Sequence, residues 1–187
     1  MNTKDFFQTT LKVYKKGAKA VGWGSKKSQD LRFRIILGIG DFYHKSVLDF
    51  GCGTGDLFRY TMDWKYTGYD VVPEMIEESK RRFPGGNFTN ELPTKKFDYV
   101  LASGVFNLAI PNWEKETYKT LKVMWELAKV GMAVNFLSSL SPKKDSRSYY
   151  ASPDKMVKFF STLTNNFTLR HDYKKNDMTF YLYKRQL

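Results

Sequence analysis

The sequence contains a single cysteine, Cys52, among its 187 residues. One thiol excludes an intramolecular disulfide, and such a chain is typical of the reducing cytoplasm. No apolar run approaches the roughly 18 residues of a membrane-spanning helix, so we expect no membrane partner. The first residues also lack the uninterrupted apolar core of a signal peptide, which agrees with a cytoplasmic location.

Histidine is almost as scarce, because His44 and His171 are the two in the chain. His, Cys, Asp and Glu residues do not cluster at the spacings that hold zinc or calcium, so we expect no required metal. Internal repeats and low-complexity blocks are lacking too, which argues against a repeat architecture.

Basic residues, in contrast, are abundant, and the formal net charge is +12. This charge has two interpretations: a surface for RNA or another polyanion, or an ordinary lysine-rich surface. The lysines are spread along the whole chain and outnumber the arginines, which favours the second interpretation. The length and the 42% hydrophobic content are typical of one globular domain over residues 1–187.

Apolar residues follow strand-like and helix-like patterns in alternation. Strands are expected at 46–50, 66–72, 87–91, 97–102, 131–137, 167–173 and 178–184. Helices are expected at 3–20, 26–38, 56–62, 73–83, 114–129 and 154–164. This alternation predicts an α/β fold with a mostly parallel seven-stranded sheet, an antiparallel terminal strand and helices on both faces. Residues 1–40 would form a helical cap, and residues 46–187 the core.

The most informative segment is a glycine loop between the first strand and the next helix, spanning 49–56 with the sequence DFGCGTGD. Glycines at such a place allow a tight turn and let a ligand lie against bare backbone. The spacing is G-x-G-x-G, and a dinucleotide fingerprint would need glycine where Asp56 stands. A phosphate loop would need a Gly-Lys-Ser/Thr ending, which is absent.

A carboxylate follows this loop at the end of the second strand. Asp70 lies about 20 residues beyond Asp49, where an acid accepts hydrogen bonds from both hydroxyls of a ribose. In sheets of this kind, ligands bind at the carboxyl ends of the strands. The glycine loop, Asp49 and Asp70 together therefore predict a nucleoside-containing ligand.

Three segments resemble motifs of the class I S-adenosylmethionine-dependent methyltransferases. Residues 47–55 (VLDFGCGTG) resemble motif I, residues 69–76 (YDVVPEMI) the second motif, and residues 97–107 (FDYVLASGVFN) the fourth-strand motif. The resemblance extends from about residue 21 to the end and is closest to a group of small bacterial and phage-type members of undefined substrate. It implies a Rossmann-like fold, S-adenosyl-L-methionine as cofactor, and methyl transfer as the activity.

The resemblance also implies roles for the matched positions. Gly51, Gly53 and Gly55 would line the methionine part of the cofactor, and Asp49 would organise the loop near its amino group. Asp70 would hold the ribose hydroxyls.

Further contacts are implied around adenine and the reacting methyl. Val71 would lie against adenine, and either Asn90 or Glu91 would stand where the family usually has an acid near the adenine amino group. Ser103 begins the loop that should face the transferred methyl. Cys52 lies within the glycine turn among the cofactor-binding positions, as a small packing residue without a base that would make it a nucleophile.

Candidates for acid–base work are His171, Tyr149 and Tyr150. The first of these is alternatively a structural or surface histidine, and the tyrosines alternatively pack. Arg32 could pair with the cofactor carboxylate if the N-terminal helices fold over it, with Trp23 beside it. A surface arginine is the alternative.

The acceptor is the least determined part of the prediction. The loop 103–107 has neither the Asp/Asn-Pro-Pro-aromatic sequence nor the Pro-Cys pair of common DNA methyltransferases. We therefore expect transfer to a small molecule, a sugar or a side chain. An RNA- or polyanion-directed methyltransferase is one alternative, and a non-catalytic binding or assembly module of the same fold is the other. The oligomeric state is left open.

Overall fold

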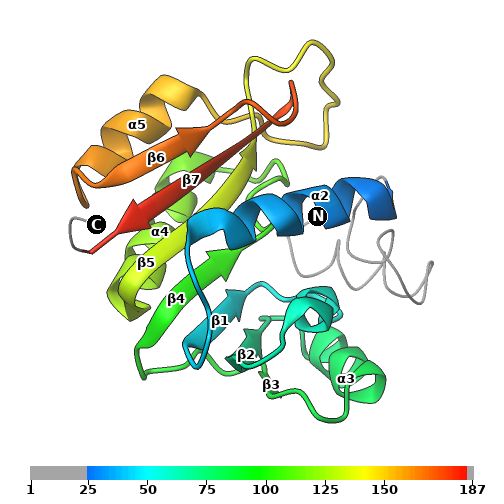
Figure 1. Ribbon diagram of the computed structural model, residues 1–187. Helices are drawn as coiled ribbons and strands as arrows, with labels where there is room; N and C mark the ends of the chain where they lie inside the picture. The colour runs from blue at the N-terminus through cyan, green and yellow to red at the C-terminus, as the bar shows by residue number, and fades with distance from the viewer. Residues whose placement is uncertain (1–24, 185–187) are drawn as a thin grey trace.

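The computed structural model describes residues 25–184, which form one seven-stranded sheet with helices on both faces (Figure 1). The strands are β1 (Ser46–Phe50), β2 (Lys65–Tyr69), β3 (Phe88–Thr89), β4 (Phe97–Ala102), β5 (Ala128–Leu137), β6 (Phe167–Arg170) and β7 (Asp177–Tyr183). Their order across the sheet is β3-β2-β1-β4-β5-β7-β6. β7 lies between β5 and β6 and runs antiparallel to both. The neighbouring strands from β3 through β2, β1 and β4 to β5 are all parallel, as the sequence predicts.

Helical elements precede β1 and connect the later strands. They are α2 (Lys26–Ile36), η2 (Leu37–Ile39), η3 (Asp56–Tyr60), α3 (Pro73–Arg82), α4 (Trp113–Leu127) and α5 (Pro153–Ser161). Ser25 caps α2 by accepting a hydrogen bond from the backbone N–H of Ser28, and a proline begins both α3 and α5. The predicted helix at 3–20 lies outside the described residues.

Apolar residues are buried on both faces of the sheet, because successive residues of a strand point to opposite faces. In β4, Tyr99 and Leu101 pack with α2, whereas Val100 and Ala102 pack with α4 and α5. Figure 1 shows α2 crossing one face of the sheet with α4 behind it. A strand covered on both faces reads as a continuous apolar run, which is why the sequence pattern identifies β4 so clearly.

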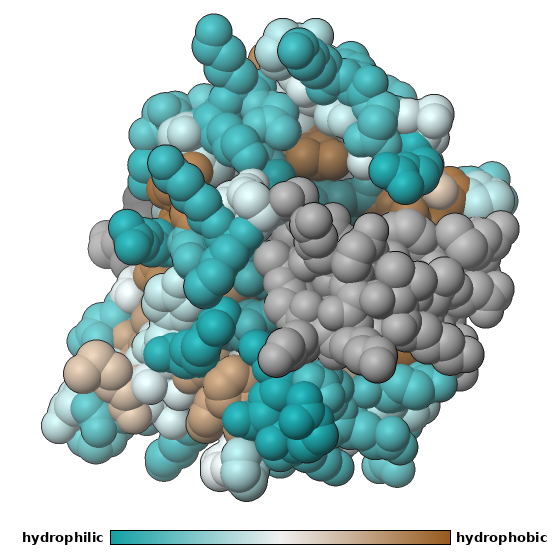
Figure 2. Space-filling model, turned by 90° about the vertical axis from the view of Figure 1, so that its right-hand side faces the viewer, coloured by the Kyte–Doolittle hydropathy of each residue, from teal (hydrophilic) through white to brown (hydrophobic). Residues whose placement is uncertain are grey.

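The ends of several elements differ from the predicted ones. β2 stops at Tyr69 and β6 at Arg170, each three residues before its predicted end. The predicted helix at 56–62 is a five-residue 3₁₀ helix that begins after Gly55, whose φ is 76°. Among the described residues, no helix is both long and apolar enough to cross a bilayer. Figure 2 accordingly shows hydrophilic residues over much of the visible described surface, with hydrophobic ones in separate patches.

Candidate functional site

The glycine loop leaves β1 with a left-handed backbone that L side chains rarely adopt. Gly51, Gly53 and Gly55 have φ values of 74°, 53° and 76°. A Cβ on Gly51 would lie 2.5 Å from a methyl of Val105, in the loop after β4. Because Gly51 has no side chain, the glycine loop packs directly against the loop after β4. Its backbone is left facing the adjoining cavity.

Asp70, directly after β2, is bonded to this loop. Its Oδ2 accepts a hydrogen bond from the N–H of Gly53 at 2.9 Å, and its Oδ1 accepts one from the N–H of Val72 at 3.0 Å. Burial raises the pKa of the Asp70 carboxyl, while the two N–H groups favour the charged form. Each oxygen keeps lone-pair capacity for a ligand.

Asp49 lies beneath the loop, in the interior of the sheet. Its side chain is buried, and Oδ2 accepts a hydrogen bond from the Tyr66 hydroxyl at 2.7 Å. Burial raises the pKa of Asp49 to about 7, against the effect of the Tyr66 hydrogen bond. The nearby Asp70 and Asp56 contribute to this rise in pKa, so a cationic ligand group here would favour the ionised form.

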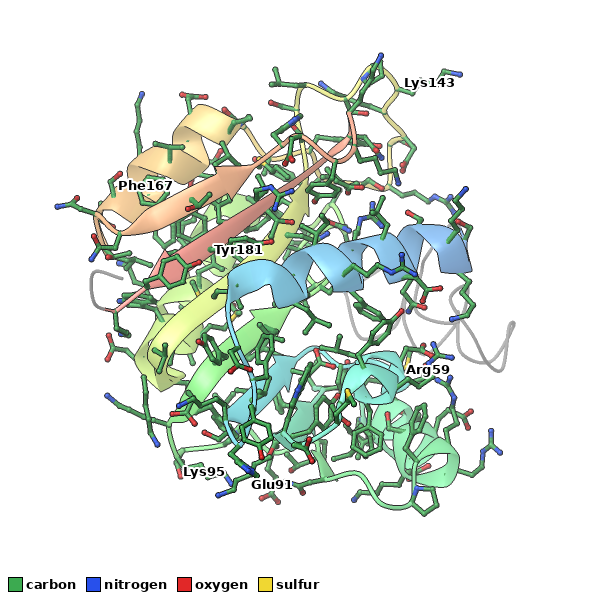
Figure 3. The ribbon with its side chains drawn as sticks, in the orientation of Figure 1. Arg59, Glu91, Lys95, Lys143, Phe167 and Tyr181 are labelled. Carbon is green, nitrogen blue, oxygen red and sulfur yellow. The ribbon has the colours of Figure 1, made fainter. Side chains whose placement is uncertain are left out.

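A pocket of about 310 Å³ opens at the carboxyl ends of β1, β2 and β4. Six of the predicted cofactor positions line it besides Asp70: Asp49, Gly51, Cys52, Gly53, Val71 and Ser103. Gly55, Asn90, Glu91 and Arg32 are not among its lining residues. Figure 3 places Glu91 at the lower edge of the molecule, the same edge as Lys95 just before β4.

Ser103 contributes an unusual feature to this pocket. Its Oγ is buried, and no group of the described residues hydrogen bonds to it. The following residue, Gly104, has a φ of 81°, and its N–H donates to Oδ1 of the buried Asn135 at 2.8 Å. A buried hydroxyl without a hydrogen bond lowers the stability of a fold by about 1–3 kcal/mol, unless a ligand supplies the missing hydrogen bond.

Cys52 combines packing with a place in the pocket wall. It is buried in a cluster with Tyr66, Ile76 and Phe88, and burial raises the pKa of its thiol well above the ordinary range. The protonated thiol that results is a poor nucleophile, which agrees with a packing role.

The three acid–base candidates lie outside the pocket lining, with His171 on a different segment from the adjacent Tyr149 and Tyr150. His171 Nε2 lies 2.8 Å from Ser138 Oγ, at a separate open depression near 171–175. Tyr149 stacks on Trp113 with ring centroids 3.8 Å apart. The Tyr150 hydroxyl hydrogen bonds to Asp145. Their catalytic role stays a prediction from the sequence.

Arg32 has a structural partner in the described residues. Its Nε and Nη2 donate to Oδ1 of Asp177 at 2.8 and 2.5 Å, and both side chains are buried. This ion pair ties α2 to the start of β7. The predicted contact of Arg32 with a cofactor carboxylate stays a prediction, and Trp23 lies outside the described residues.

Several pocket residues escape sequence reasoning because they come from helices. α2 contributes Gln29 and Phe33, and α4 contributes Glu116, Thr117 and Thr120. The periodicity of the sequence shows which face of α4 is apolar. It does not show which of the helix's polar residues line a pocket formed with loops far away in the chain. Within residues 25–184, no group of three or more His, Cys, Asp or Glu side chains is arranged to hold a metal ion.

The seven-stranded sheet, with its glycine loop after β1, has the class I methyltransferase fold, and comparisons with known proteins agree. Residues 48–131 match the family described as methyltransferase domain. The chain is 30% identical over 149 residues to the "Putative methyltransferase Rv1506c" of Mycobacterium tuberculosis (strain H37Rv), covering 72% of this chain and 90% of that protein. The chain therefore belongs to the S-adenosylmethionine-dependent methyltransferases.

Solved structures of low sequence identity share the fold. Magnesium protoporphyrin IX methyltransferase from Synechocystis PCC 6803, with bound SAH, has a TM-score of 0.69 at 15% identity, with 97% of each chain covered. The DhpI-SAM-HEP complex has a TM-score of 0.71 at 12% identity, covering 95% of this chain and 94% of that one. The N-methyltransferase NodS from Bradyrhizobium japonicum WM9 has a TM-score of 0.64 at 10% identity, covering 87% and 99%.

Proposed function

We propose that this methyltransferase acts on a small, uncharged or basic acceptor molecule. The observation that carries the proposal is the charge of the pocket. Among the described residues, its lining contains the carboxylates of Asp49, Asp70 and Glu116 and no lysine or arginine. A phosphate-rich acceptor would meet like charge there, whereas an amine or a neutral hydroxyl compound would not.

The same charges suit S-adenosylmethionine, which supplies a methyl group on a positively charged sulfonium. In the proposed arrangement, the backbone of Gly51 and Gly53 lies along the methionine part, with Gly55 ending the turn. Asp49 faces the amino group. Asp70, already oriented by two backbone N–H groups, accepts from the ribose hydroxyls.

The opposite side of the pocket would hold adenine and the reacting centre. Val71, which is 58% exposed beside Asp70, covers one side of the adenine in this proposal. Ser103 lies near the methyl, where its unpaired buried Oγ offers a hydrogen bond to the acceptor or cofactor.

Transfer from a sulfonium is a direct displacement, so the protein's main contribution is alignment. The apolar side chains of Phe33, Phe106 and Ile110 line the pocket and would exclude water. Orientation alone can supply about 7–11 kcal/mol at best. Such a reaction does not require a prominent general acid or base in the pocket.

Calorimetric titration with S-adenosylmethionine and S-adenosylhomocysteine, with NAD as the control, tests the cofactor site. We expect binding of the first two and none of NAD. A second assay with a labelled methyl group then compares amine and hydroxyl small molecules with RNA. Labelling of RNA but of no small molecule would overturn the acceptor proposal.

A further inference from the structure

The described segment after β3 places no acid in the pocket. The family resemblance points to Asn90 or Glu91, after β3. Both are exposed, and neither lines the pocket. Glu91 instead hydrogen bonds locally, through its N–H to Thr89 Oγ1 at 3.1 Å. A different element must therefore supply any acceptor for the adenine amino group.

Helix α4 borders the same pocket. Glu116, Thr117 and Thr120 all line it, and their spacing places them near one side of the helix. They share the pocket with Phe50 and Tyr69, whose rings lie 5.0 Å apart at the ends of β1 and β2. Tyr69 directly precedes Asp70 and packs on the same apolar cluster as α4, so α4 meets the pocket near the residue proposed to hold the ribose.

The carboxylate of Glu116 is available to a ligand. It is exposed at the pocket, and within the described residues it has neither an ion pair nor a hydrogen bond. Glu114, two residues earlier on the same helix, differs in both respects. Its Oε1 accepts from Lys155 Nζ at 2.6 Å and from the Tyr149 hydroxyl at 3.2 Å, and it lies outside the pocket lining.

We infer that Glu116 is the residue that recognises the adenine amino group, in place of an acid after β3. The inference rests on the proposed cofactor site. An ionised carboxylate only accepts hydrogen bonds, so it pairs with a 6-amino group and repels a 6-oxo group. Glu116 would thus select adenosine over inosine in the cofactor.

The test compares S-adenosylhomocysteine with S-inosylhomocysteine by calorimetry, using the full chain. The wild type should prefer the adenosyl compound by about tenfold or more, the usual effect of a charge-assisted hydrogen bond. Glu116→Gln carries an amide that can turn to donate to the 6-oxo group, and it should lose most of that preference. Glu114→Gln is the matched control and should keep it.

Each outcome decides a different claim. An unchanged adenosyl-to-inosyl ratio in Glu116→Gln overturns the role of Glu116, even when both compounds bind. A loss of preference in Glu114→Gln as well would attribute the effect to α4 as a whole and also overturn it. Failure of the wild type to bind either compound overturns the cofactor site itself, and the inference with it.

Discussion

Asp70 joins the two parts of the proposed cofactor site, because one carboxylate bonds the glycine loop and faces the pocket. We predict that Asp70→Ala lowers affinity for S-adenosylhomocysteine by at least about tenfold, since charge-assisted hydrogen bonds to the ribose would be lost. Calorimetry measures the affinity, and circular dichroism checks that the fold is retained. Asp63→Ala, at an exposed site outside the pocket lining, is the control. Equal affinity in the Asp70 variant would refute the assignment.

Asp49 should make cofactor binding depend on pH. Burial raises its pKa from the ordinary 3.8 to about 7, with Asp70 and Asp56 contributing to the rise and the Tyr66 hydrogen bond opposing it. Between these two values the folded protein binds more protons than the unfolded chain, so this group's contribution to stability falls as pH rises from about 4 to 7. A cationic amino group favours ionised Asp49, so binding should strengthen as pH rises through about 7.

Calorimetry at pH values on both sides of that pKa tests this prediction. Binding should release a proton, which appears as a dependence of the measured enthalpy on the buffer's ionisation enthalpy. Asp49→Asn has no ionisable group at this place and should show a flatter pH profile. A wild-type affinity that is constant over the range would contradict the proposed contact.

The site residues that the sequence identifies are those with local signals. The glycine loop requires positive φ, and Asp70 follows a strand about 20 residues after Asp49. Both can therefore be identified from the sequence alone. Glu116 and Phe33 cannot, because their place in the pocket depends on how α4 and α2 cross the sheet. The third strand is predicted over 87–91, but β3 has only two residues, so Asn90 and Glu91 come after it, and neither lines the pocket.

At the scale of elements, the burial of a strand decides how clearly the sequence predicts it. Strands covered on both faces, such as β4 and β5, are predicted from continuous apolar runs, and the hairpin β6–β7 from its short connection. The ion pair between Arg32 and Asp177 is invisible to such patterns, since the two residues are far apart in the chain and each resembles a surface charge. The structure buries both between α2 and β7.

This ion pair supports our third prediction. Asp177→Ala leaves a buried guanidinium without this partner and should lower the free energy of unfolding by about 3–5 kcal/mol. The double variant Arg32→Met, Asp177→Leu replaces both charges with apolar groups and should be less destabilised than Asp177→Ala. Urea denaturation measures both values. A double variant that is as destabilised as Asp177→Ala, or more so, would contradict this account of the pair.

The double variant also separates two roles for Arg32. A folded protein without this arginine should keep its affinity for S-adenosylhomocysteine if the guanidinium serves to hold α2 on β7. A large loss of affinity would instead support the contact with the cofactor carboxylate that the sequence suggested. Calorimetry on the same preparation distinguishes them.

At the scale of the whole molecule, the charge of the chain and the charge of its pocket have opposite signs. The formal net charge is +12, yet the described pocket lining is acidic. Lysines such as Lys45, Lys65 and Lys129 lie exposed at the amino ends of their strands, on the edge of the sheet opposite the pocket. Among the described residues, part of the charge that suggested a polyanion therefore lies away from the pocket, and none of it lines the pocket.

We accordingly predict that RNA neither competes with the cofactor nor accepts a methyl group. Total RNA in excess should leave the affinity for S-adenosylhomocysteine unchanged, even where it binds the lysines weakly and in a salt-dependent manner. A filter assay with a labelled methyl group should find no label in RNA at low or moderate salt. Labelled RNA would show that a basic surface guides a polyanion into an acidic pocket, and it would make the RNA-directed alternative the better account of the positive charge.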